Sequence, residues 1–205
     1  MGLKEAEGLR KFCLELSSNQ PSPGGGTASA AAGAMASSLL IMVCGITRRS
    51  KKHEAHWTEL ESIQTALEGL RDGLVRLASD DAKAYDDVVE AMRHLKADSD
   101  RQASMAAENA LKKATEVPTM TAERCQSVLE EAAKVARLGT KSARSDVASA
   151  IYLALAGAKG AMSNMRINLE GQRDRAFAES IKAKLASYDT RSTRLAENAL
   201  AVLRG

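Results

Sequence analysis

Apolar residues recur at three- and four-residue intervals along most of the chain, a spacing typical of amphipathic helices. The strongest run lies between residues 53 and 79 and would line one helix face with Leu60, Ile63, Leu67, Leu70, Leu74 and Leu77. A similar stripe follows residues 172–203, from Phe177 to Val202. The pattern therefore predicts an all-α fold.

Turn-forming and capping residues divide the rest of the chain into further helices. We expect these over residues 3–16, 27–48, about 80–95, 101–138 and 142–169. Ser79, Asp80 and Asp81 can either cap a new helix or interrupt the preceding one. Pro118 lacks a backbone donor, so a kink or a break is expected there. Long helices joined by short turns are typical of an antiparallel bundle.

The composition indicates a folded core made of small side chains. The 205 residues suffice for one domain, which we assign to residues 1–205. Apolar residues make up 44% and charged residues 27%, which favours a globular fold over disorder. With one Trp, three Tyr and two Phe, the core must be filled mainly by Ala, Leu, Met and Val. Helices with such side chains can pack closely.

One long segment tests the expectation of a soluble protein. Residues 27–47 contain no charged side chain and are long enough to span a bilayer. The first half of this segment is rich in Ala, Ser and Gly, and its strongly apolar residues are confined to Leu39–Ile46. We expect a central helix buried in a bundle or dimer, with a membrane span as the alternative.

Charge and cysteine content exclude several classes. The net charge of +3, without a basic stripe interleaved with aromatics, does not indicate nucleic-acid binding. Cys13, Cys44 and Cys125 form no Cys-x-x-Cys pattern, which favours reduced thiols in the cytoplasm. The charged first residues do not resemble a signal peptide. His53 and His56 lack a Glu-x-x-His partner helix, so no metal site is predicted.

The first candidate site is the segment Pro21-Ser22-Pro23-Gly24-Gly25-Gly26-Thr27. Three consecutive glycines carry a large entropic cost, and a turn between helices needs only one. Thr27 is suited to be a helix N-cap, and the amides of the following turn could then hold a carboxylate or a phosphate. The alternative is a tight inter-helix turn without a ligand.

A carboxylate and a phenol form the second candidate site. Asp81 and Tyr85 lie four residues apart, so they share one helix face with Ala84 and Val88. Burial on a partly apolar face would raise the pKa of the Asp81 carboxyl towards values useful for acid–base chemistry. The alternative is that Asp80 and Asp81 are ordinary helix-start residues.

A third group of polar residues shares one face of the helix expected over residues 142–169: Asp146, Asn164 and Asn168. The two asparagines are one turn apart and could bind an amide-like ligand edge together. Asp146 lies about 33 Å from Asn168 along a straight helix, too far to line one small pocket. A two-fold partner could bring the two ends into separate sites. Alternatively, Asp146 interacts with the helix dipole.

The densest basic cluster comprises Arg48, Arg49, Lys51 and Lys52, at an expected helix junction. It is either a solvated junction or a binding site for the anionic tail of a ligand.

Five sequence blocks occur in an order that is characteristic of one enzyme family. They are Pro21–Ala30, Asp81-x-x-Ala84-Tyr85-x-x-Val88, Val117-Pro118, Ser145–Ala148 and Asn164–Leu169. Together they resemble the cyclodeaminase domain of formiminotransferase-cyclodeaminase and its stand-alone relatives, which include methenyltetrahydrofolate cyclohydrolases. The resemblance covers nearly the whole chain.

The resemblance implies an all-helical homodimer, or a dimer of dimers, with folate near the subunit interface. It implies a tetrahydrofolate derivative as substrate and no permanently bound cofactor. Asp81 would be the acid–base carboxylate. The implied substrate-binding residues are Ser22, Pro23, Gly24, Gly25, Gly26, Thr27, Tyr85, Asp146, Asn164 and Asn168, with Lys51 and Lys52 available for the glutamyl tail.

The leading functional hypothesis is a methenyltetrahydrofolate cyclohydrolase, in which water adds to the bridge between N5 and N10 and 10-formyltetrahydrofolate is formed. In a cyclodeaminase, which is the second hypothesis, N10 attacks a formimino carbon on N5 and ammonia leaves. Each reaction passes through a tetrahedral centre and needs a group that shuttles a proton. Two further hypotheses are a non-catalytic dimer that binds a folate-like anion and a purely structural bundle.

Overall fold

The computed structural model describes residues 3–98 and 100–204, and in these ranges it contains six α-helices, two 3₁₀ helices and no strand. The predicted all-α fold is therefore confirmed. The helices are α1 (Leu3–Leu16), α2 (Gly25–Arg48), η1 (Lys51–His56), α3 (Trp57–Ala97), α4 (Arg101–Leu138), η2 (Lys141–Ala143), α5 (Arg144–Leu169) and α6 (Arg175–Arg204).

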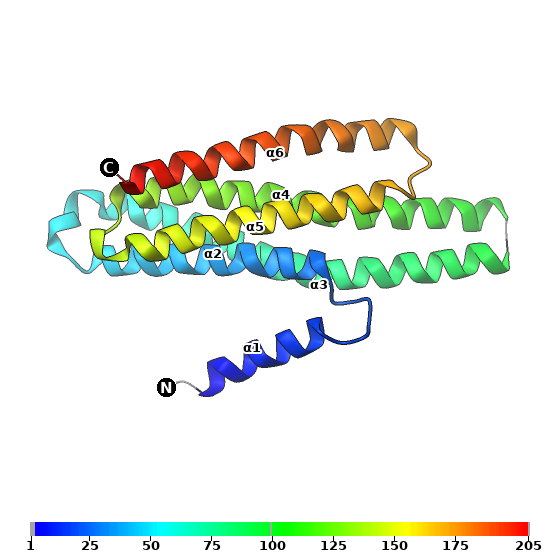
Figure 1. Cartoon of the computed structure of the whole chain (residues 1–205), viewed down its shortest axis with the longest axis horizontal. Coiled ribbons are helices and arrows are strands. Elements are labelled where there is room, and N and C mark those ends of the chain that lie inside the picture. The colour runs from blue at the N-terminus through cyan, green and yellow to red at the C-terminus, as the bar shows by residue number, and fades with distance from the viewer. Residues whose placement is uncertain (1–2, 99, 205) are drawn as a thin grey trace.

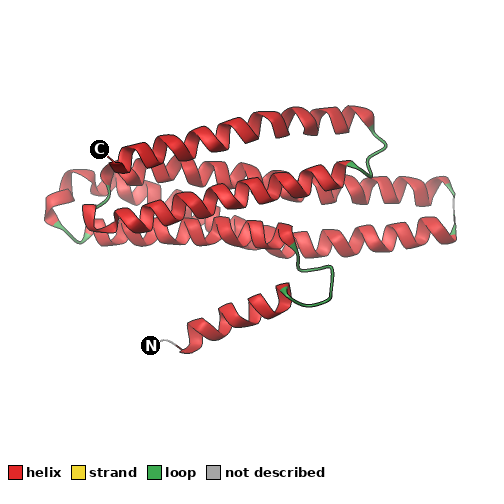
Figure 2. Cartoon of the chain, viewed as in Figure 1, coloured by secondary structure: helices red, strands yellow, loops and turns green. Residues whose placement is uncertain are grey.

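Helices α2 to α6 lie side by side in an elongated bundle, and successive helices reverse direction at short connections (Figures 1 and 2). Helix α2 is central, since it packs against α3, α4 and α5, while α6 covers α4 and α5. Helix α1 lies apart from the other helices, at the end of a longer connection. This arrangement is the antiparallel bundle expected from the sequence.

Small residues bring α2 and α5 into close contact. A Cβ atom added to Gly157 of α5 would lie 2.7 Å from the Ser29 carbonyl oxygen of α2. A Cβ atom added to Gly33 of α2 would lie 2.6 Å from Cys125 Sγ of α4. Neither position has room for a side chain, so glycine is needed for these three helices to meet at this distance.

Helix α2 is the apolar segment that the sequence also allowed as a membrane span. It is the one helix within residues 3–98 and 100–204 whose length and composition would permit a span, and 50% of its most apolar window is buried in the bundle. Leu40, Val43 and Cys44 are fully buried. The helix thus occupies the central position that the sequence analysis predicted for it.

Helix α3 differs from the prediction of a boundary near residue 80. It is continuous from Trp57 to Ala97, so Asp80 and Asp81 neither cap a new helix nor interrupt an old one. The buried face that includes Leu74 and Leu77 continues to Ala84. Tertiary burial of this face outweighs the local preference of aspartate for helix ends.

Helix α4 passes through Pro118 without a break. Val117, Pro118 and Thr119 are all buried, and burial of the surrounding turn compensates for the missing helical hydrogen bond. The carbonyl group that loses its partner belongs to Ala114, which faces the pocket described below.

Candidate functional site

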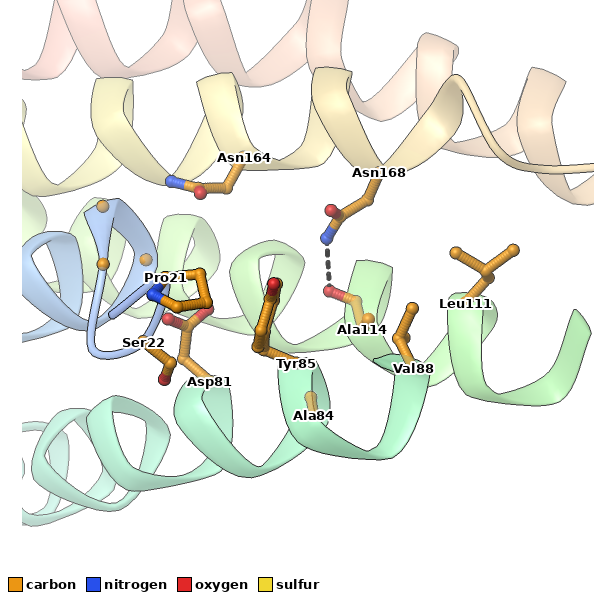
Figure 3. A pocket seen from close by; sticks show the side chains of 13 residues that line it. Pro21, Ser22, Asp81, Ala84, Tyr85, Val88, Leu111, Ala114, Asn164 and Asn168 are labelled. Carbon is orange, nitrogen blue, oxygen red and sulfur yellow. Dashed lines mark hydrogen bonds between the residues drawn. The ribbon is translucent and has the colours of Figure 1, made fainter. Parts of the chain in front are cut away.

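A pocket of about 210 Å³ lies where the N-terminus of α2 meets the C-terminal half of α3, the N-terminal half of α4 and the C-terminal part of α5 (Figure 3). It is thus formed by segments that are far apart in the sequence. Its lining residues are Pro21, Ser22, Gly24, Gly25, Gly26, Asp81, Ala84, Tyr85, Val88, Leu111, Ala114, Asn164 and Asn168.

The Asp81 carboxylate lies against the glycine turn. Helix α2 begins at Gly25, and its N-cap residue Gly24 provides no side-chain cap. A Cβ atom on Gly26 would overlap the Asp81 carboxyl group, so only glycine permits this approach. The sequence predicted an anion-binding site at the start of this helix. The anion found there is the protein's own Asp81 carboxylate, which the helix N-terminus attracts.

Thr27 is the third residue of α2 and not its N-cap, so that prediction is wrong. The Thr27 hydroxyl group lies 3.0 Å from Asp81 Oδ2 and 3.3 Å from the Ala78 carbonyl oxygen, and it can donate to either. Because Thr27 is buried, these contacts hold the carboxylate from the protein side while the pocket lies on the other.

The environment of Asp81 raises the pKa of its carboxyl group above the ordinary value. Partial burial is the main cause, since it disfavours the charged form. Hydrogen bonds from the Thr27 hydroxyl and backbone N–H groups act in the opposite direction and do not cancel the effect. The carboxyl group is therefore more easily protonated than an exposed aspartate.

Asn164 and Asn168 form the opposite wall of the pocket, on α5. Asn164 Nδ2 donates to the Gly160 carbonyl oxygen at 2.9 Å, and Asn168 Nδ2 donates to the Ala114 carbonyl oxygen at 2.7 Å. Neither Oδ1 atom takes a hydrogen bond from the described residues, 3–98 and 100–204. Both side chains therefore offer an acceptor to a ligand.

The sequence model of formiminotransferase-cyclodeaminase matches residues 8–187 of this chain. The chain belongs to this family. The match covers most of the chain, including every residue that lines the pocket.

Two curated relatives and one solved structure agree with the family assignment. A methenyltetrahydrofolate cyclohydrolase of Methylorubrum extorquens is 38% identical over 84% of each chain. The formimidoyltransferase-cyclodeaminase of Sus scrofa is 30% identical over 87% of this chain and 34% of its own length. The crystal structure of a formiminotetrahydrofolate cyclodeaminase from Thermotoga maritima, 30% identical, superposes with a TM-score of 0.87 over 96% of both chains.

The structure brings most of the candidate residues of this family member into one place. Its pocket is lined by eight of them: Ser22, Gly24, Gly25, Gly26, Asp81, Tyr85, Asn164 and Asn168. Thr27 lies directly behind, bonded to Asp81. Tyr85 projects its ring across the pocket towards α5 (Figure 3). The roles of these residues remain predictions.

Four candidate residues lie elsewhere. Pro23 lines a separate apolar groove of about 740 Å³ between α1 and the bundle. Lys51, Lys52 and Asp146 lie at the other end of α2 from the pocket, near the C-terminus of α2 and the start of α5. These two segments are joined there, because the Thr140 N–H donates to Thr47 Oγ1 at 3.0 Å. One chain therefore does not bring these three residues to the pocket.

The sequence analysis did not single out two lining residues, Leu111 and Ala114. Leu111 contributes apolar surface and carries no chemical signal. Ala114 contributes its backbone carbonyl group, and its one signal in the sequence is its position four residues before Pro118.

Metal binding was not predicted from the sequence. No group of three or more His, Cys, Asp or Glu side chains within residues 3–98 and 100–204 could hold a metal ion. The absence of a metal from the reaction stays a prediction.

Proposed function

We propose that this protein is a methenyltetrahydrofolate cyclohydrolase, which opens 5,10-methenyltetrahydrofolate to 10-formyltetrahydrofolate. The observation that carries the proposal is the partly buried Asp81 carboxyl group, with its raised pKa, on the wall of a pocket whose other wall presents amide oxygens. The cyclohydrolase of Methylorubrum extorquens supports it, since it matches most of this chain at 38% identity.

The proposed reaction uses Asp81 twice. The carboxylate stabilises the cationic bridge and accepts a proton from the water whose oxygen bonds to the bridge carbon. Asp81 then returns this proton to N5 as the bond between N5 and the carbon breaks. The hydroxyl group on that carbon releases its proton to solvent and becomes the formyl carbonyl. The reaction consumes one water and releases one proton.

Thr27 can satisfy Asp81 in both protonation states. When Asp81 is charged, the Thr27 hydroxyl donates to Oδ2 over 3.0 Å. When Asp81 holds the proton, the hydroxyl can turn to the Ala78 carbonyl oxygen, 3.3 Å away, and accept from the carboxyl group. Neither state leaves a buried polar group unpaired, which lowers the cost of moving the proton.

The second candidate is a formiminotetrahydrofolate cyclodeaminase. The Thermotoga maritima structure favours it, because that cyclodeaminase superposes over nearly the full length of both chains. In this reaction N10 attacks the carbon of the protonated formimino group on N5. The same carboxyl group would pass the N10 proton to the formimino nitrogen, which leaves as ammonia while the cationic methenyl bridge forms. A dimer that binds a folate-like anion without turnover is the third candidate.

One pair of assays separates these candidates. Purified full-length protein is mixed with methenyltetrahydrofolate, and loss of the methenyl chromophore is compared with that in buffer alone. In parallel, ammonia release from formiminotetrahydrofolate is measured. We expect acceleration of the first reaction. Acceleration of the second alone would reassign the protein as a cyclodeaminase, and binding without either reaction would leave a folate-binding protein.

We also propose that the protein is a homodimer whose interface includes the exposed face of α2. Met35, Met42 and Ile46 are 46%, 40% and 41% exposed and lie on one side of this helix at intervals of seven and four residues. Apolar side chains in such a row are suited to be covered by the same face of a second copy. Two such dimers could pair further, as the family resemblance implies.

An antiparallel two-fold contact along α2 would set the basic end of one copy beside the pocket of the other. Lys51, Lys52 and Asp146 all lie at that basic end. We propose that the two lysines bind the glutamyl tail of the substrate held by the partner, and that Asp146 contributes to the same composite site. The pocket itself is lined by no Lys or Arg among the described residues, so a cation is needed from elsewhere.

Hybrid dimers test the composite site. Asp81→Asn and the double variant Lys51→Glu/Lys52→Glu are co-expressed with different tags, and the hybrid is purified. One of its two sites then combines an intact Asp81 with intact lysines, so it should regain about half of the wild-type activity. A hybrid of Asp81→Asn with Asp81→Gln is the inactive control. No activity above that control would contradict the composite site.

The cytoplasm is the proposed location, and the free thiols of Cys13, Cys44 and Cys125 are consistent with a reducing compartment. Tetrahydrofolate derivatives are proposed as substrates, with no permanently bound cofactor.

A further inference from the structure

Pro118 lies in the buried interior of α4, one turn after Ala114. In a regular helix, the N–H group of residue 118 would donate to the carbonyl oxygen of residue 114. Proline has no N–H group, so the Ala114 carbonyl oxygen has no partner within its own helix. Ala114 is partly buried and lines the pocket, so its carbonyl group needs a donor either from the facing helix or from water.

The donor comes from the facing helix. Asn168 Nδ2 of α5 donates to the Ala114 carbonyl oxygen at 2.7 Å, as the dashed line in Figure 3 shows. Two nearby carbonyl oxygens of α4 accept side-chain hydrogen bonds from their own helix instead. The carbonyl oxygen of Thr115 accepts from the Thr119 hydroxyl group, and that of Val117 accepts from the Thr121 hydroxyl group. The gap left by proline is thus filled by a residue of the pocket.

This hydrogen bond decides which end of the Asn168 amide faces a ligand. An asparagine amide carries donors on nitrogen and acceptors on oxygen, and the two orientations have nearly the same shape. With Nδ2 held by the Ala114 carbonyl oxygen, Oδ1 is left for the pocket. Asn164 is oriented likewise by its bond to the Gly160 carbonyl oxygen. The α5 wall therefore presents a row of acceptors.

We propose that Pro118 is a positioning residue, which frees the Ala114 carbonyl group to orient Asn168 so that the pocket selects a ligand edge carrying N–H donors. The amino group and ring N–H groups of a reduced pterin form such an edge. The identity of this ligand rests on the proposed function, whereas the orientation of Asn168 does not.

The test replaces Pro118 with alanine in the full-length protein. The restored N–H group would donate to the Ala114 carbonyl oxygen and compete with Asn168. We expect the melting temperature to stay equal or rise, because a helix interior disfavours proline. We expect the KM for methenyltetrahydrofolate to rise about tenfold with little change in kcat, as for loss of one oriented hydrogen bond. Unchanged KM would overturn the proposal.

A double-mutant cycle separates this role from general damage to α4. In the Asn168→Ala background, Pro118→Ala should have no further effect on KM, since both changes act through one amide. An equal rise of KM in both backgrounds would refute the proposal. Thr119→Ala is the matched control, because it alters the next turn of α4 without changing the Ala114 carbonyl group, and its KM should be that of the wild type.

A spectroscopic measurement keeps the proposal testable even if neither folate is turned over. The side-chain NH₂ resonances of Asn168, assigned by their loss in Asn168→Ala, should shift in Pro118→Ala without any ligand. Unshifted resonances would show that proline does not orient the amide. A shift in a protein that is inactive on both folates would uphold the positioning role while the proposed function fails.

Discussion

The two walls of the pocket differ in what their polar groups can do with a proton. The wall formed by α2 and α3 presents Asp81, which can gain or lose a charge against the glycine turn. The α5 wall presents Asn164 and Asn168, neutral amides whose nitrogens are held by backbone carbonyl groups. The group for proton transfer and the groups for ligand recognition thus lie on separate helices. Substitutions on the first wall should lower kcat, and those on the second should raise KM.

Asp81→Asn should have the largest effect on activity. Loss of an acid–base group lowers kcat by about 10²–10⁴-fold. Stability should be unchanged or higher, because the amide removes a charge that burial disfavours. Turnover is measured by loss of the methenyl chromophore, and thermal unfolding by circular dichroism. Asp80→Asn, at an exposed neighbouring position, is the control. Full activity of Asp81→Asn would remove this residue from the mechanism.

Gly26→Ala tests whether the carboxylate position is essential. The added methyl group would overlap the Asp81 carboxyl group and displace it. A displacement of about 1 Å can cost about 10²-fold in rate, and we expect the loss to appear in kcat. Gly45→Ala lies on the same helix with nothing within 4 Å of the new methyl group and should behave as wild type. Equal activity of the two variants would show that the close approach is dispensable.

Asn164→Ala probes the recognition wall. Removing one amide oxygen that accepts from the ligand should raise KM about tenfold and leave kcat nearly unchanged. Steady-state kinetics on methenyltetrahydrofolate measures both constants. Ser163→Ala, at an exposed position beside it, is the matched control. A loss confined to kcat would contradict the division between the two walls.

The pH profile gives the smallest expected effect. Because the pKa of Asp81 is raised, the acidic limb of kcat/KM should lie above the usual aspartate value of about 3.9. Thr27→Val removes a hydrogen bond that favours the charged form, so the limb should move to higher pH, while Thr27→Ser should keep it in place. If the acidic limb does not move in Thr27→Val, the Thr27 hydroxyl group does not influence the pKa of Asp81.

The same shift has a consequence for stability. A carboxyl group with a raised pKa in the folded state stabilises the protein fully below its unfolded-state pKa, and this contribution is lost as pH rises through the folded-state value. As pH rises from the unfolded-state pKa of Asp81 through its folded-state pKa, the wild type should therefore lose unfolding free energy relative to Asp81→Asn.

The helices and their buried faces could be predicted because hydrophobic periodicity records burial directly. The continuity of α3 through Asp80 and Asp81 could not, since local capping preference opposed it and the contact with Gly26 that keeps Asp81 in place is tertiary. Asp81 and the two asparagines were found from their helical spacing and the family resemblance.

Other features of the site were beyond sequence reasoning for definite physical reasons. The Ala114 carbonyl group is backbone, and no side chain marks its role. The sequence indicated that Asp146 and Asn168 are too far apart for one small pocket, and the structure places them towards opposite ends of α5. The sequence could not locate Lys51 and Lys52 relative to the pocket, because their position depends on how α2 packs in the bundle.

The close contact of α2 with α5 at Gly157 determines the width of the pocket. The glycine turn starts α2, and Asn164 follows Gly157 on α5 by two turns, so the spacing of these two helices sets the width between the turn and the amide wall. Residues that do not line the pocket therefore determine its width. A single methyl group added at Gly157 would change the spacing of α2 and α5, and with it the width of the pocket, without contacting any residue that lines the pocket.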